Sequence, residues 1–264
     1  MHAQSNAPQA RFELKVFACE VLRDELMFIA ANVPHHLDID FLPQGYHQEP
    51  RQGRLELQSR IDCVGEGYDY ILVGYGLCGC LLEGLVARQI PLVIPRAHDC
   101  LTLFLGSKER YLRMFEDNPG TYYFTRGWLR AIDQGLADRT GTDLSMCDLP
   151  QQGAPVGLEI DRRHLEGLDE EQRRYLEEEL RRWMQIYTRG VLIEFDQFVC
   201  VGLRERVRQL CESRGWKFEC VKGDLGLLQR WLSGSWTEQE FLIVPPGHKV
   251  VADFEGNVIK AVPQ

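Results

Sequence analysis

Cysteine and histidine side chains follow several short apolar runs of the chain, at the points where those runs end. Cys19 closes the first such run, and Cys78 and Cys100 come shortly after two later ones. Thiolate and imidazole are the preferred ligands of zinc, and thiolates also hold iron–sulfur clusters. We therefore take Cys19, Cys78 and Cys100 as candidate metal ligands. His98 is a fourth ligand or a general base, and His47 is a further candidate ligand.

Other polar and aromatic residues lie close to these candidates along the chain. The residues that we expect on the cofactor side of the site are Glu20, Tyr75, Arg96 and Asp99. Asp99 is adjacent to His98 and can accept a hydrogen bond from an imidazole N–H, which would orient that ring. Asp224 and His248 follow later apolar runs, and we expect them to act with His98 as catalytic groups on the substrate side.

Simpler interpretations exist for each of these residues. A cysteine at a strand end is often only buried apolar filler, and Cys80 ranks below the other cysteines as a ligand. Asp224 suits a turn that caps the following helix. A nucleophilic pair of Cys78 or Cys100 with His98 is a further alternative. A metal site is favoured because several expected strand ends supply Cys or His at the same edge.

The elements that would position these residues alternate between short apolar strands and amphipathic helices, a pattern typical of parallel sheets with crossover helices. We predict strands at residues 14–19, 37–42, 70–74, 91–95, 120–124, 191–195, 216–220 and 241–244, with a terminal hairpin of 250–252 and 258–262. We predict helices at residues 20–31, 51–64, 168–187, 203–214 and 225–232. Ligands of open α/β sheets bind at the carboxyl ends of the strands. The sequence therefore predicts an α/β fold of two Rossmann-like β/α halves, with mostly parallel sheet and a cleft at the strand carboxyl ends.

The composition of the chain suggests where these halves meet. Residues 1–12 are polar and are predicted to form a disordered tail, and residues 13–134 form the first half with the Cys/His cluster. Residues 135–165 are rich in Gly, Asp, Thr and Pro with little periodicity, which predicts a linker. Residues 166–264 form the second half. The site would then occupy a cleft between the halves.

Charge and hydropathy exclude some classes of partner. The chain has 264 residues and a net charge of −9, so a general affinity for nucleic acid or an anionic membrane is not expected. No apolar run is long enough to span a bilayer, and the polar start shows no signal peptide. We expect a cytoplasmic protein whose nine cysteines stay reduced. Its partner would be a small-molecule substrate, a metal or another protein, and its oligomeric state is left open.

Several longer segments carry a resemblance to a known family. They are residues 19–25 (CEVLRDE), 74–79 (GYGLCG), 95–100 (PRAHDC), 105–107 (LGS), 120–122 (GTY), 127–128 (GW), 223–224 (GD) and 246–248 (PGH). Over roughly residues 14 to 248 the chain resembles the bacterial and archaeal family called domain of unknown function 1638. Cys80 is a departure, because the family more often has Asn at that position.

The resemblance implies an association rather than a mechanism. Members of the family tend to accompany corrinoid proteins and corrinoid-dependent methyltransferases of one-carbon metabolism. We therefore expect a metal-binding protein, with zinc or iron, of corrinoid-linked methyl transfer, either a metal-dependent methyltransferase or an accessory of one. The alternatives are a non-catalytic accessory that binds a corrinoid or its carrier protein, and a three-cysteine iron–sulfur protein.

Overall fold

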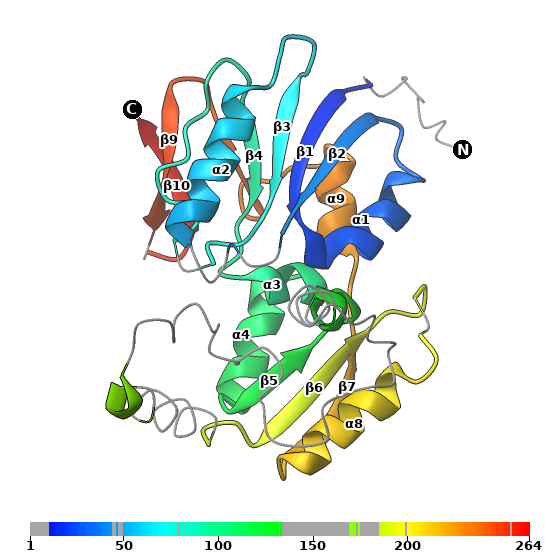
Figure 1. Ribbon diagram of the computed structural model, residues 1–264. Coiled ribbons are helices and arrows are strands. Elements are labelled where there is room, and N and C mark those ends of the chain that lie inside the picture. The colour runs from blue at the N-terminus through cyan, green and yellow to red at the C-terminus, as the bar shows by residue number, and fades with distance from the viewer. Residues whose placement is uncertain are drawn as a thin grey trace, which may run out of the picture. The chain divides into compact units, whose positions relative to one another are not determined.

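The computed structural model describes residues 11–43, 46, 50–78, 80–131, 133, 169–172, 174, 185–198, 200–253 and 255–264 (Figure 1). The protein is a mixed α/β protein with mostly parallel sheets, and it divides into two compact units, Met1–Tyr111 with Asp224–Gln264, and Leu112–Gly223. The predicted linker at 135–165, most of the predicted helix at 168–187 and the predicted tail up to residue 10 lie outside the described residues. None of the described helices is long and apolar enough to cross a membrane.

The first unit is built on a five-stranded sheet in the order β2-β1-β3-β4-β8. Its strands are β1 (Glu13–Cys19), β2 (His36–Leu42), β3 (Tyr70–Gly74), β4 (Leu92–Pro95) and β8 (Phe241–Val244). The first four run parallel, as predicted, whereas β8 is antiparallel to β4. β1 and β3 lie in the middle of the sheet with most of their residues buried, which explains why their sequences are almost continuously apolar.

Helices cover both faces of this sheet. They are α1 (Arg23–Ala30), α2 (Pro50–Asp62) and α9 (Gly226–Leu232). η1 (Glu20–Leu22) follows β1 directly, α3 (Cys100–Leu105) follows the loop after β4, and α4 (Lys108–Asp117) spans the boundary between the two units. In Figure 1, α2 lies over the near face and α9 over the far face. A β-carbon on Gly74 of β3 would stand 2.8 Å from the Trp231 ring and 2.8 Å from the Ala18 Cβ. Glycine at this position therefore lets α9 pack directly on the two central strands.

The terminal hairpin that the sequence predicts is present as β9 (His248–Asp253) and β10 (Val258–Pro263). Arg96, just after β4, fixes this hairpin to the end of the sheet. Its guanidinium donates hydrogen bonds to the carbonyl oxygens of Glu238 (2.7 Å), Asn257 (3.0 Å) and Ile259. The side chain that we expected to face a cofactor thus binds backbone carbonyls from two later segments.

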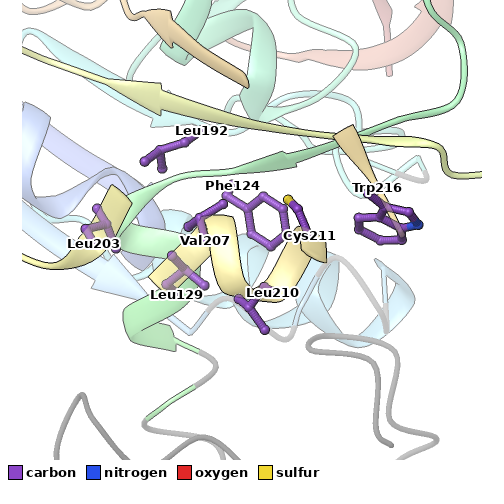
Figure 2. Packing of buried hydrophobic residues seen from close by; sticks show 8 residues of the cluster. All are labelled: Phe124, Leu129, Leu192, Leu203, Val207, Leu210, Cys211 and Trp216. Atoms are coloured by element: carbon purple, nitrogen blue, oxygen red, sulfur yellow. The ribbon is translucent and has the colours of Figure 1, made fainter. Parts of the chain in front are cut away.

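The second unit contains a parallel three-stranded sheet in the order β5-β6-β7. Its described elements are β5 (Thr121–Phe124), β6 (Arg189–Glu194), β7 (Lys217–Lys222) and α8 (Leu203–Ser213). Figure 2 shows the apolar cluster in which side chains of β5 and β6 meet those of α8. A β-carbon on Gly190 of β6 would stand 2.3 Å from the Cys211 Sγ, so this glycine admits the cysteine to the cluster. Cys211 is buried apolar filler here.

The division into units differs from the predicted one at the end of the chain. We assigned residues 166–264 to a second half, but Asp224–Gln264 belongs to the first unit. The reason is that β8 pairs with β4 rather than with the strands of the second unit, with Leu92 opposite Val244 and Pro95 opposite Phe241. Because this pairing is antiparallel, the carboxyl end of β8 lies at the amino end of β4.

Candidate functional site

The carboxyl ends of β1, β3 and β4 lie at one edge of the first sheet, and α3 begins there (Figure 1). Cys19 is the last residue of β1 and keeps an extended backbone before the chain turns into η1. Its side chain is only 8% exposed, and burial raises the pKa of Cys19 to about 11. A backbone hydrogen bond from Val21 acts in the opposite direction and lowers that pKa. The N–H group with this effect belongs to Val21, two residues after the strand ends.

Cys78 lies in the loop after β3, and this loop is joined to the loop after β4. The backbone N–H of Leu77 donates to Ala97 O (2.8 Å), and that of Cys78 donates to His98 O (2.9 Å). Cys78 has a φ of 40°, in the left-handed region that a residue with a β-carbon seldom adopts. Such backbone strain persists only where the surrounding structure holds it, and it is frequent at functional sites.

Cys78 is half-buried. Burial raises the pKa of Cys78 to about 12, and the charges of Asp99 and Cys19 raise it further. Backbone hydrogen bonds from Gly76 and Cys100 lower it. The N–H groups with this effect come from both loops, Gly76 from the loop after β3 and Cys100 from the start of α3.

Cys100 is the first residue of α3. Burial raises its pKa well above the usual value of a thiol, and the charges of Cys78, Asp99 and Cys19 add to that effect. A negative charge on Cys19 raises the pKa of both Cys78 and Cys100. A negative charge on Cys78 likewise raises the pKa of Cys100. The structure brings these three predicted ligands to one place, and we call them the thiol cluster.

Tyr75 lies against the thiol cluster. It follows β3 directly and is 4% exposed, and its hydroxyl oxygen has no hydrogen-bond partner among the described residues. Burial raises the pKa of Tyr75 well above its ordinary value, and the charges of Cys19 and Cys78 raise it further. The phenol is therefore a protonated hydrogen-bond donor near neutral pH.

Asp99 has a structural role that differs from the expected one. Its carboxylate caps α3 by accepting a hydrogen bond from the Leu101 N–H (3.0 Å), and it also accepts hydrogen bonds from the Thr102 N–H and from Tyr111. Burial nevertheless raises the pKa of Asp99. The sequence signal for this role was the position of an Asp immediately before a helix, and we had assigned the residue to an imidazole instead.

The other predicted residues lie around or away from the thiol cluster. The His98 side chain is exposed, although its backbone carbonyl is part of the joined loops. Glu20 forms a bidentate ion pair with Arg23, with donor–acceptor distances of 2.6 and 2.7 Å. The negative charge of Glu20 raises the pKa of Cys19. Asp224 is exposed, and its carboxylate accepts a hydrogen bond from the Gly226 N–H (2.7 Å), which is the turn geometry that we gave as its simpler interpretation.

His248 is not brought to the thiol cluster. It starts β9 four residues after Val244, and Val244 pairs with Leu92 at the amino end of β4. The thiol cluster lies at the opposite edge, where β4 ends. The expectation that His248 reaches the strand carboxyl ends depended on a parallel strand at 241–244. His47 lies outside the described residues.

The donor set can be compared with what a metal requires. Among the described residues, no three His, Cys, Asp or Glu side chains already stand in positions that would hold a metal ion. The donor type is nevertheless the one that zinc and iron prefer, because all three residues are cysteines and follow strands that end at one edge of the sheet. Rotation about a single side-chain torsion moves a cysteine sulfur, so binding would require thiol rotation within a fixed backbone.

Comparison with known proteins agrees with the resemblance seen in the sequence. The chain belongs to the family described as Protein of unknown function (DUF1638), which matches residues 41–232. The match includes Cys78 and Cys100 and the joined loops that carry them, and it begins after Cys19. No curated protein and no solved structure matches the chain.

Proposed function

We propose that this protein binds a thiophilic metal, zinc or iron, through Cys19, Cys78 and Cys100. The observation that supports this proposal is the thiol cluster itself, in which one buried and two half-buried cysteines follow three parallel strands at one edge of the sheet. Ligands that come from separate strand ends are held by the sheet, so the backbone of such a site is set by the fold.

The main alternative is that the three cysteines are neutral apolar filler, as Cys211 is in the second unit. Two features favour ligands over filler. Backbone N–H groups near Cys19 and Cys78 lower the pKa of these two thiols and so favour the thiolate, which filler does not require. The left-handed backbone of Cys78 is also unfavourable for a residue whose only task is to occupy space.

The reaction class follows from the family resemblance, and we propose corrinoid-linked methyl transfer, with the protein as a methyltransferase or its accessory. A zinc ion bound to thiolates would lower the pKa of a thiol that accepts a methyl group, whereas an iron–sulfur cluster would carry electrons to the corrinoid. The chain's own residues would hold the metal through the thiol cluster and exclude water by their burial. The exposed His98 would serve a proton transfer at the rim of the site.

The proposed partners are a small-molecule substrate or a corrinoid protein, and the proposed compartment is the cytoplasm. Reduced thiols persist in a reducing compartment. All eight of the described cysteines are free, which agrees with this proposal.

Metal analysis of anaerobically purified protein tests the proposal. Colourless protein with about one zinc per chain supports a mononuclear site. Brown protein with iron and acid-labile sulfide supports a cluster on the same three cysteines. Replacement of Cys19, Cys78 and Cys100 by Ser should abolish the metal content, and the matched control Cys80→Ser, at an exposed cysteine, should not. An equal loss of metal in Cys80→Ser would show that the metal is not bound by Cys19, Cys78 and Cys100 alone. Folded wild-type protein that binds neither metal would overturn the proposal.

A further inference from the structure

Arg96 is the first residue after β4, at the edge of the first sheet where the parallel strands β1, β3 and β4 end. β8 begins at the same edge, because Phe241 pairs with Pro95 in the antiparallel ladder. Ligands of open α/β sheets bind at this edge. Arg96 is half-buried there, so its guanidinium places a positive charge where the fold offers a ligand site.

The guanidinium of Arg96 has five N–H groups, and backbone carbonyls accept from three of them. Nε donates to Glu238 O, and Nη1 donates to Asn257 O and Ile259 O. The other amine, Nη2, donates to none of the described residues, and it is not among the atoms that the protein encloses without a partner. Nη2 is therefore held in place by the bonds of its neighbours and is open to solvent.

The positive charge of Arg96 is not neutralised by direct contact, because none of the described carboxylates forms an ion pair with it. Burial lowers the pKa of Arg96, and the charges of Asp253 and Glu238 oppose this effect from beyond ion-pair distance. Asp253 pairs instead with Lys260, at 3.5 Å. A half-buried cation that only neutral carbonyls contact retains part of its desolvation cost, which a bound anion would offset.

The turn that holds Arg96 has a strained backbone. Val258 has a φ of 68°, and the Ile259 N–H donates to Asn257 O (2.8 Å), which closes a γ-turn of the rare type around Val258. A positive φ is especially unfavourable for a β-branched residue. The carbonyls that Nη1 binds lie one on each side of Val258, so the guanidinium and the strained turn hold each other. Such strain is frequent at sites that position a ligand.

Lys108, the first residue of α4, brings a second cation to the same turn. Its Nζ donates to Gly256 O (3.4 Å), the carbonyl that precedes the Asn257 carbonyl bound by Arg96. Lys108 likewise has no ion pair with any residue that the structure describes. The two cations therefore concentrate positive potential beside one turn, although the net charge of the chain is −9.

We propose that Arg96 and Lys108 form an anion site at the carboxyl edge of the first sheet, which binds the phosphate or carboxylate group of a small-molecule ligand. Nη2 of Arg96 donates the hydrogen bonds, and Lys108 adds its charge. The carbonyl bonds fix the guanidinium before the ligand arrives, so little side-chain entropy is lost on binding. The site requires neither a metal nor the thiol cluster, so it can fail or succeed independently of the proposed metal binding.

Inorganic phosphate and acetate are the probes, because they carry the two candidate groups alone. Isothermal titration calorimetry measures their binding to the full-length protein, with sodium chloride added to keep the ionic strength constant. The wild type is compared with Arg96→Met, Lys108→Gln and Lys260→Gln. Lys260→Gln is the matched control, because it removes the same charge from the same hairpin but from a lysine that already pairs with Asp253.

The wild type and Lys260→Gln should bind one of the two probes with equal affinity. Lys108→Gln should bind that probe about threefold more weakly, as expected for the loss of one solvent-accessible charge contact. Arg96→Met should show no binding. Because Arg96→Met also loses its bonds to the turn, circular dichroism checks that it is folded, and Lys108→Gln carries the test if it is not.

The remaining outcomes separate the two ligand groups from a wrong assignment. Binding of phosphate alone would indicate a phosphorylated ligand, and binding of acetate alone a carboxylate ligand, and both results support the site. Equal binding to all four proteins would place the anion elsewhere and overturn the proposal. An equal loss in Lys108→Gln and Lys260→Gln would also overturn it, because only the overall charge would then matter. Wild-type protein that binds neither probe at millimolar concentrations would overturn it as well.

Discussion

Gly76 lies so close to Asp99 that a β-carbon on residue 76 would stand 2.5 Å from the Asp99 Cα. This approach is between two backbones, so no flexible side chain can move aside. It lets Leu77 and Cys78 reach the carbonyl oxygens of Ala97 and His98. The joined loops, and with them the relative positions of Cys78 and Cys100, depend on the absence of a side chain at residue 76.

Gly76→Ala should therefore separate the joined loops. We expect a loss of about 1–3 kcal/mol in the free energy of unfolding, which is typical of an atom forced into a packed site. Denaturant unfolding of metal-free protein measures it. Gly65→Ala is the matched control, because a β-carbon there meets no atom within 4 Å, and its effect should stay within about 0.5 kcal/mol. A Gly76 variant as stable as the Gly65 variant would show that the loops tolerate separation.

Arg96 allows the cofactor-side role expected from the sequence to be compared with the role that the structure shows. Arg96→Met keeps the aliphatic stem and removes hydrogen bonds to three backbone carbonyls, so the unfolding free energy should fall by about 1–3 kcal/mol. The metal content should not change. Arg88→Met, which removes an ion pair of an exposed guanidinium with Asp62, should have little effect on stability. Loss of metal without loss of stability in the Arg96 variant would instead support a role at the cofactor.

The elements of this fold differ in how far the sequence could predict them. β1 and β3 were predicted because central parallel strands are continuously apolar over a length that no surface element shows. The apolar run at β8 was also found, but its direction was not, since Phe241–Val244 has the same pattern in either orientation. Direction depends on which strand it pairs with, and that partner lies about 150 residues earlier in the chain. The incorrect prediction for His248 follows from the unknown direction of β8.

The candidate site shows the same limit at the level of single residues. The convergence of the three cysteines was predictable, because the ends of parallel strands meet at one edge whatever lies between them in sequence. The role of Arg96 was not predictable, because its partners are backbone carbonyls, which no residue type reveals. The role of Asp99 had a signal, its position immediately before a helix, which we assigned to an imidazole instead. The buried hydroxyl of Tyr75, which has no hydrogen-bond partner among the described residues, was equally unpredictable, since the lack of a partner depends on the surrounding residues of the fold.

Asp38, in the outermost strand β2 of the first sheet, allows a test of how stability depends on pH. Hydrogen bonds from Lys15 and then from Tyr68 lower the pKa of Asp38 below its ordinary value. A carboxylate with a lowered pKa in the folded state stabilises the fold above its unfolded pKa of about 3.9, and that contribution is lost as the pH falls through the lower folded value. Since the Asp38 side chain is 41% exposed, the contribution is screened by solvent and should be below about 1 kcal/mol.

Asp38→Asn should therefore lower the unfolding free energy at pH 7, and the difference from the wild type should shrink as the pH falls below about 4. Urea unfolding at pH 7, 5 and 3 measures this, with high salt as a second variable because exposed ion pairs are screened. A difference that stays constant from pH 7 to pH 3 would show that Asp38 acts through packing rather than through its charge.

In the second unit, Gly190 and Cys211 form a pair that can be tested by a double-mutant cycle. A β-carbon at residue 190 would stand 2.3 Å from the Cys211 Sγ and 3.1 Å from the Phe124 ring. Gly190→Ala should cost about 1–3 kcal/mol of unfolding free energy by overpacking, and Cys211→Ala alone should also destabilise by leaving a small cavity. The double variant should be more stable than the sum of the two losses predicts, because the smaller residue 211 makes room for the new methyl group. Residues in contact commonly show coupling of about 0.5–3 kcal/mol. Strictly additive losses would mean that the Phe124 ring, rather than the thiol, sets the limit at this position.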